Sequence, residues 1–234
     1  MNLKKIFMAA VLCGTMAAGA FASDNHTFGI DICGGIVGYG TTKFDATYNG
    51  IKQEFTYKEV PFLPIKVSTY DCFLLNNHLG IYGSIGVIPS GQVDFKISPA
   101  NEKDEDAWVG VGLEFMVGPA FGVDLGDSGI RFQCGVPFHA EFGAYFSDSK
   151  VLNVTTKRTR SYSAFGLGLT PQFRFMANRR CSFVLGVDFI FDFAMTFKQK
   201  NETDFNTTTI ELDPKNAFRF KTVPYLGLGI NFGD

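Results

Sequence analysis

The stretch Trp108-Val-Gly-Val-Gly-Leu-Glu-Phe-Met-Val-Gly-Pro-Ala-Phe-Gly-Val-Asp-Leu125 decides the fold. Its odd-numbered positions are apolar from Val109 to Leu125, whereas the even-numbered positions are mostly glycine, alanine and acidic residues. A period of two places these sets on opposite faces of a strand and does not fit a helix. The run is far longer than the roughly five or six residues of an ordinary strand. It predicts one long strand with a single apolar face.

Two further stretches, 130–146 and 183–197, repeat this alternation. The polar face of the first carries Arg131, His139 and Glu141. In the second, the odd positions through Met195 and Phe197 are apolar, and the opposite face carries Asp188, Asp192 and Thr196. Long strands that are apolar on one face are typical of a tilted, membrane-spanning barrel.

The composition excludes several classes of protein. The 234 residues are 46% hydrophobic, include 26 Phe and 26 Gly, and carry a formal net charge of −2. Such a chain is too apolar to be disordered and too acidic for a dedicated nucleic-acid binder. It also has no apolar run of the roughly 18 residues that a membrane helix needs. The combination favours a sheet, and we expect no nucleic-acid partner.

The N-terminus has the pattern of a secretory signal peptide. Lys4 and Lys5 precede an apolar run, and Ala20-Phe-Ala22 has the form of a cleavage site, so residues 1–22 are expected to be removed. Cys13 raises the alternative of a lipoprotein, but Leu12 stands where a small residue is expected. The four remaining cysteines show no zinc-binding spacing, and we expect scattered, unpaired thiols. These are Cys33, Cys72, Cys134 and Cys181.

The remaining chain, 23–234, divides into eight predicted strands. They cover about 27–40, 60–75, 79–88, 108–125, 130–147, 161–176, 182–198 and 217–232. Three short connections are rich in Gly, Asn and Asp, as in tight turns. Four polar connections are longer, at about 41–59, 89–107, 148–160 and 199–216. The layout predicts an all-β fold, an eight-stranded antiparallel up-and-down transmembrane β-barrel with four long outer loops and three short periplasmic turns.

A proline begins the apolar face of every second strand. The four are Pro61, Pro119, Pro171 and Pro224. A closed barrel has no edge strand at which a missing N–H is harmless. We therefore expect a bulge or a local break in the hydrogen-bond ladder at each proline.

These patterns, over the whole of 23–234, resemble the small outer-membrane β-barrels of the OmpA-transmembrane, OmpX and OmpW kind. The resemblance implies the bacterial cell outer membrane as location and outer-membrane lipid and the barrel-insertion machinery as partners. The last strand, Tyr225-Leu-Gly-Leu-Gly-Ile-Asn-Phe232, is similar to the C-terminal assembly signal of such barrels, with Tyr225 and Phe232 as its aromatic residues. Gly233 and Asp234 follow, where the aromatic residue is usually last. This departure suggests a divergent branch, with a spirochaetal origin as one interpretation.

The polar face predicts the contents of the lumen. Its ionisable residues are Asp31, Lys66, Glu114, Asp124, Arg131, His139, Glu141, Arg174, Asp188, Asp192, Arg219 and Lys221. Eight strands enclose a space that side chains can just fill, and buried charges need partners. A regular hairpin at 126–129 sets Asp124 opposite Arg131 and Glu114 opposite Glu141. The second pair requires a base from another strand or a retained proton. We expect a polar plug and no open pore.

A catalytic role is the alternative for His139 and Glu141, which share one face as a base and its orienting carboxylate would. No serine is forced beside His139, so membership of a charged network is favoured. We expect no enzyme activity, no catalytic residue, no cofactor and no metal site.

Residues near the outer strand ends give further candidates. The acidic segment 102–106 is a hypothetical calcium site, although it lacks the spacing and glycine of a ligating loop. The basic segment 157–160 is a candidate contact for lipopolysaccharide or host glycans. Aromatic residues at the strand ends predict part of an outer girdle. They are Trp108, Tyr145, Phe146 and Tyr162.

Three functions remain open. The first is a structural or interaction barrel, adhesin- or antigen-like, whose outer loops meet host or envelope molecules. The second is a passive channel for small or hydrophobic solutes, as the OmpW resemblance implies. The third is a soluble, lipocalin-like ligand binder, which would expose the glycine-rich face to water and is disfavoured. No motif names a ligand.

Overall fold

The computed structural model describes residues 27–36, 39–48, 51–60, 63–75, 78–98, 102–104, 108–151, 154–176, 180–203, 206–212 and 214–232. The predicted signal peptide lies outside the described residues. The strands are β1 (Thr27–Gly35), β2 (Tyr39–Tyr48), β3 (Ile51–Val60), β4 (Ile65–Leu74), β5 (Leu79–Ser98), β6 (Glu102–Asp104), β7 (Trp108–Asp124), β8 (Ile130–Gly135), β9 (Phe138–Val151), β10 (Val154–Met176), β11 (Cys181–Glu202), β12 (Thr207–Leu212) and β13 (Lys215–Phe232). Within these ranges no helix is long and apolar enough to cross a membrane.

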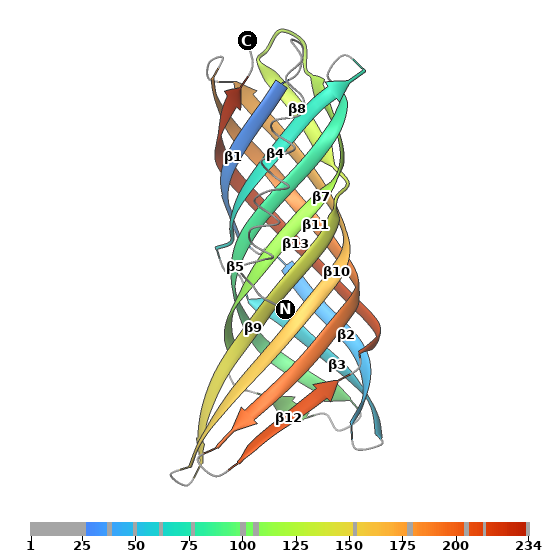
Figure 1. Ribbon diagram of the computed structural model, residues 1–234, viewed down its shortest axis with the longest axis vertical. Helices are drawn as coiled ribbons and strands as arrows, with labels where there is room; N and C mark the ends of the chain where they lie inside the picture. The colour runs from blue at the N-terminus through green and yellow to red at the C-terminus, as the bar shows by residue number, and fades with distance from the viewer. Residues whose placement is uncertain are drawn as a thin grey trace.

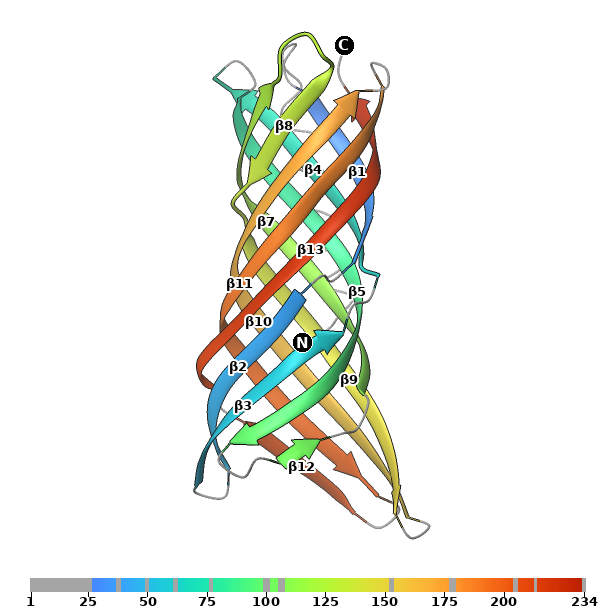
Figure 2. The same ribbon diagram turned by 180° about the vertical axis from the view of Figure 1, so that it is seen from behind.

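The strands close into one antiparallel barrel (Figures 1 and 2). β13 pairs with β1, which closes the ring, and β5 pairs with both β4 and β7. Three of the eight barrel strands are interrupted, because β1 and β2, β3 and β4, and β8 and β9 are successive parts of the same strand. The predicted eight-stranded antiparallel barrel is confirmed.

The strands continue further than the sequence analysis predicted. β5 reaches Ser98, β11 reaches Glu202, and β2 and β3 form a hairpin within the predicted loop 41–59. β12 adds a strand beside the end of β11. Polar residues therefore do not end these strands, because backbone pairing continues beyond the apolar part of the barrel. We call the end with the tight turns the turn end, and the opposite end, where these strands protrude, the extended end (Figure 1).

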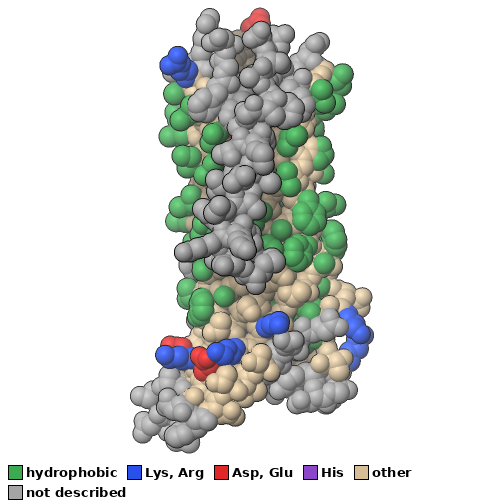
Figure 3. Space-filling view, in the orientation of Figure 1, with side chains coloured by type: hydrophobic (Ala, Val, Ile, Leu, Met, Phe, Trp, Pro, Cys, Tyr) green, Lys and Arg blue, Asp and Glu red, His purple; other side chains and the backbone are tan. Residues whose placement is uncertain are grey.

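The barrel is apolar outside and polar inside. Outward side chains such as Val109, Phe193 and Leu228 are exposed, whereas Glu114, Arg219 and Lys221 are buried. On the face that Figure 3 shows, apolar side chains lie along most of the height of the barrel, and most of the charged side chains gather near the extended end. This arrangement is the reverse of that in a water-soluble protein and suits a surrounding lipid bilayer.

The predicted facing fails beyond Phe193. Phe165 pairs with Ala194 while Gly166 pairs with Asp192, so Phe193 is an extra residue in β11. Such a bulge exchanges the two faces of a strand. Met195 and Phe197 therefore point into the lumen, at 7% and 2% exposure, and Thr196 is exposed. The sequence analysis placed all three on the wrong face.

The ladder is broken at each described strand proline, as predicted. Pro119 lies where β7 changes partner, from Phe138 of β9 to Gly135 of β8. Pro171 lies in a two-residue gap in the pairing of β10 with β11. Pro224 lies beside the interruption between β1 and β2, where its carbonyl accepts a hydrogen bond from the Ile36 N–H. Pro61 lies outside the described residues.

Within the part of the chain that the structure describes, none of the four cysteines is joined in a disulfide. Cys33, Cys72 and Cys134 are buried and Cys181 is exposed, in agreement with scattered thiols.

Inward glycines make room for large neighbours. A Cβ on Gly143 would lie 2.6 Å from ring atoms of Tyr162, and one on Gly186 would lie 2.5 Å from the Tyr225 ring. The small face of the strands is thus filled by side chains of the neighbouring strands and encloses no open channel at these positions.

Candidate functional site in the barrel lumen

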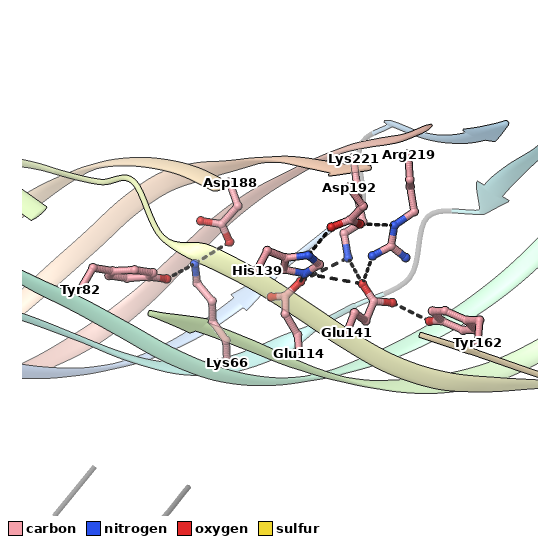
Figure 4. A network of polar contacts seen from close by, with 10 residues as sticks. All are labelled: Lys66, Tyr82, Glu114, His139, Glu141, Tyr162, Asp188, Asp192, Arg219 and Lys221. Carbon is pink, nitrogen blue, oxygen red and sulfur yellow. Dashed lines mark hydrogen bonds and ion pairs between the residues drawn. The ribbon is translucent and has the colours of Figure 1, made fainter. Parts of the chain in front are cut away.

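A charged layer crosses the middle of the lumen (Figure 4). Glu141 Oε2 accepts hydrogen bonds from Arg219 (2.5 Å) and Lys221 (2.8 Å), and Glu141 Oε1 accepts one from the Tyr162 hydroxyl (2.5 Å). Arg219 also donates to Asp192 Oδ2 at 2.6 Å. These contacts join β9, β10, β11 and β13, so the layer ties the barrel together across its interior.

His139 joins the remaining acids of this layer. It is fully buried, with Nδ1 2.6 Å from Asp192 Oδ1 and Nε2 3.2 Å from Glu114 Oε2. Ionised carboxylates only accept hydrogen bonds, so an imidazolium that donates from both nitrogens satisfies this geometry. With that proton, three positive charges, on Arg219, Lys221 and His139, balance the negative charges of three carboxylates. These are Glu114, Glu141 and Asp192.

The predicted pairings of β7 with β8 and with β9 are present. Asp124 pairs with Arg131, and Glu114 pairs with Glu141. The base that the two facing carboxylates require comes from β13, because Lys221 Nζ lies 3.2 Å from Glu114 and 2.8 Å from Glu141.

The same residues offer the geometry of a metal site, but a side chain already takes the place of the cation. Ligand atoms of Glu114, His139 and Glu141 lie within 4.8 Å of one another. The Lys221 ammonium contacts both carboxylates of this group. Catalysis finds no support either, since both ring nitrogens of His139 face carboxylates and the ring is closed off from solvent.

A second ion pair lies beside the charged layer, toward the turn end. Lys66 Nζ is 2.6 Å from Asp188 Oδ2 and lies 3.5 Å from the centre of the Tyr225 ring. Tyr70 and Tyr82 pack next to it, with ring centres 4.6 Å apart.

Polar contacts also fill the turn end. Arg131 bonds Asp124 at 2.8 Å, and Arg174 bonds Asp31 and Asn231. Gln172 donates to Gln133 at 3.0 Å. The predicted lumen residues are all buried except Asp124, which lies at the rim.

The extended end of the lumen holds aromatic rings that the sequence analysis missed. Tyr145 and Tyr162 stack with ring centres 5.1 Å apart and pack with Phe197, and Phe44 stacks on Phe55 at 5.0 Å. The two groups meet where Phe44 lies 5.8 Å from Phe197. We call these five residues the aromatic layer. Tyr145 and Tyr162 are therefore not part of an outer girdle, and the parity that Tyr145 shares with His139 and Glu141 was the signal for this.

The remaining predicted positions lie elsewhere. Tyr225 of the predicted assembly signal points into the lumen and donates to Gln172, whereas Phe232 pairs its backbone with Phe28. The side chains of the acidic segment 102–106 lie outside the described part. In the basic segment 157–160, Lys157 is exposed and Arg160 is buried, with a 2.8 Å bond to Gln199.

No protein-family model and no curated protein matches the chain. Solved structures do. A major outer membrane protein from Thermus thermophilus is 14% identical with a TM-score of 0.59, over 88% of this chain and 99% of that chain. The outer membrane protein OprG from Pseudomonas aeruginosa is 12% identical with a TM-score of 0.55, over 90% and 98%. The outer membrane protease OmpT from Escherichia coli is 8% identical with a TM-score of 0.39, over 92% and 99%.

These similarities concern the fold. The chain has the fold of the eight-stranded outer-membrane barrels of bacteria, as the Thermus protein and OprG show. The likeness to the protease is too remote to carry an argument about catalysis. A spirochaetal origin gains no support from them.

Proposed function

Because the chain has the fold of bacterial outer-membrane barrels, we propose that it is an integral outer-membrane protein with a closed lumen, which acts through its extended end as a structural or interaction protein. On this proposal the turn end faces the periplasm and the extended end faces outward. The partners are host or envelope molecules, in the manner of an adhesin or antigen.

The protruding sheet at the extended end carries this proposal. β9, β10, β11 and β12 pair in that order beyond the apolar part of the barrel. Among the described strands, β12 pairs with β11 alone, so one edge of β12 offers backbone N–H and C=O groups to another chain. Such an edge binds extended segments by strand addition.

The filled lumen supports the same proposal. The aromatic layer and the charged layer lie one behind the other across the barrel. A passive axial channel, the alternative function, would need a path through both. Conductance of the refolded chain in a planar bilayer tests this, once a shift between heated and unheated gel samples shows that it has folded. We expect an electrically silent barrel, and discrete conductance steps would overturn the closed lumen.

A binding assay tests the role of the sheet. Cells that display the wild-type barrel are compared with cells whose Thr207–Leu212 strand is replaced by a short Gly-Ser link. The readout is adhesion to immobilised envelope or matrix proteins. We expect adhesion to fall at least about tenfold in the variant. The control variant Leu63→Ala changes an exposed apolar residue just before β4 and should bind as wild type. Equal adhesion of all three would contradict a role for β12.

A further inference from the structure

The polar contacts drawn in Figure 4 fall into two groups. Lys66, Asp188 and Tyr82 form the smaller group, and the charged layer around Glu141 forms the larger one. One carboxylate of each group, Asp188 of the smaller and Glu114 of the larger, lines the same small cavity inside the barrel. The cavity therefore borders both groups.

This cavity has the size of one water molecule. Its volume is about 10 Å³ for the centre of a water-sized sphere, and part of its wall is apolar, formed by Pro64, Ile88 and Val223. Such a volume is near the lower limit for holding a single water. An occupant with more than one heavy atom does not fit.

Asp188 offers an acceptor that the protein does not use. The residue is 1% exposed, and its Oδ2 accepts a hydrogen bond of 2.6 Å from Lys66 Nζ. Within the described residues, its Oδ1 has no hydrogen-bond partner. A buried acceptor without a donor is costly. Since Asp188 lines the cavity, a donor placed there would remove this cost.

Further oxygens lie around Gly86, which also lines the cavity. A Cβ on Gly86 would lie 3.4 Å from the Ile65 carbonyl oxygen and 3.7 Å from Glu114 Oε1. Each of these oxygens has two lone pairs, so it can accept a hydrogen bond in addition to one that it already accepts. A water in the cavity thus has the two to four polar partners that a buried water needs.

The charges around the cavity are already balanced. Lys66 balances Asp188, and the three bases of the charged layer balance its three carboxylates. An added cation or anion would be a buried charge without a counterion, which is expensive. The cavity therefore favours a neutral donor.

We propose that the cavity is a binding site for one water molecule, which donates to Asp188 Oδ1 and to the Glu114 carboxylate. The water joins the two groups into one polar network, which then runs from Tyr82 on β5 to Tyr162 on β10. This inference concerns the lumen and goes beyond the proposed function of the outer sheet.

Magnetic resonance of the refolded full chain in detergent micelles tests the site. The protein is deuterated and carries protonated isoleucine methyl groups. Ile88 is 2% exposed and lines the cavity, so we expect a nuclear Overhauser cross-peak between its methyl group and water. Ile190 is the control, because it is fully buried in a cluster with Tyr70 and Met116 and should show no such cross-peak. Absence of the Ile88 cross-peak would overturn the proposal.

Two glycine variants on β5 form a matched pair. Gly86→Ala adds a methyl group in the cavity, whereas Gly83 lies on the opposite face of the strand, where a Cβ meets Thr69 Cγ2 at 3.6 Å. We expect the Ile88 cross-peak to be lost in Gly86→Ala and kept in Gly83→Ala. Heat-modifiable gel migration confirms that both variants fold. Both keep Lys66, so a cross-peak relayed through its exchanging ammonium protons would survive in Gly86→Ala and would refute the site.

Urea unfolding gives a second, independent readout. Gly86→Ala expels the water and leaves Asp188 Oδ1 without a donor, so we expect the unfolding midpoint to fall below that of the wild type. In an Asp188→Asn background the charged acceptor is absent, and the same glycine substitution should lower the midpoint by less. Equal shifts in the two backgrounds, or a raised midpoint in Gly86→Ala, would show that Asp188 does not depend on a water in this cavity.

Discussion

The middle of the lumen and its extended end are filled by opposite chemistry. In the middle, Glu141 collects an arginine, a lysine and a tyrosine hydroxyl, and every contact is polar. At the extended end the aromatic layer fills the same cross-section with stacked rings. The charged layer depends on complete pairing of charges, because an unpaired buried charge is expensive. The aromatic layer depends on shape and apolar contact. The barrel is thus closed twice, by two kinds of contact that meet at Tyr162, whose hydroxyl donates to Glu141 and whose ring stacks on Tyr145.

The largest expected effect comes from breaking the charged layer at its centre. Glu141→Gln leaves Arg219 and Lys221 without their shared carboxylate, and removal of one partner from a buried ion pair costs about 3–5 kcal/mol. Urea unfolding in detergent micelles measures the change. Glu202→Gln is the control, because Glu202 and Lys200 are both partly exposed and such pairs contribute under about 1 kcal/mol. Equal effects of the two variants would show that the charged layer does not hold the barrel.

A smaller effect is expected in the aromatic layer. Phe197→Leu removes the ring that packs against Tyr145, Tyr162 and Phe44, with an expected loss of about 1–2 kcal/mol. Phe193→Leu, four residues earlier and facing outward, should change stability by less than about 0.5 kcal/mol. Both variants should stay electrically silent, since the charged layer still fills the lumen. Ion conduction by Phe197→Leu would mean that the rings alone close the barrel.

Thiol labelling of cysteine variants tests the boundary between the two layers. These variants are expected to change stability little. The bulge at Phe193 turns Met195 inward and Thr196 outward. In a Cys181→Ser background, Thr196→Cys should react with N-ethylmaleimide at least about tenfold faster than Met195→Cys, since buried thiols are inert. The reverse order of reactivity would mean that β11 runs without a bulge.

This boundary also marks how far the sequence could predict the structure. Strict alternation predicted the barrel and the charged layer, down to Glu114 opposite Glu141, because one period of two runs through β7 and β9. The single extra residue at Phe193 leaves no mark in hydrophobicity, since the odd-numbered positions of β11 stay apolar through Met195 and Phe197 although they change face there. Met195 and Phe197 were therefore misplaced. The pairing of Lys221 with two acids depends on which strands meet across the lumen, and alternation along one strand carries no such information.

Beyond both layers, at the extended end, similar polar contacts are exposed to water and are expected to contribute least to stability. A hydrogen bond from Asn216 and the charge of Lys52 hold the pKa of Asp45 below its usual value of 3.8. A lowered folded-state pKa stabilises the folded form above the pH at which the unfolded carboxyl ionises, and this contribution is lost as the pH falls through the lowered value. Titration of the Asp45 carboxyl by nuclear magnetic resonance should therefore show a midpoint below 3.8 in the wild type and a return toward it in Asn216→Ala. In the Asp45→Asn variant, the free energy of unfolding should no longer change with pH in the range between the ordinary and the lowered pKa of Asp45. The buried contacts of Glu141 should be unaffected. A midpoint unchanged by Asn216→Ala would show that β2 and β13 do not hold this contact at the extended end.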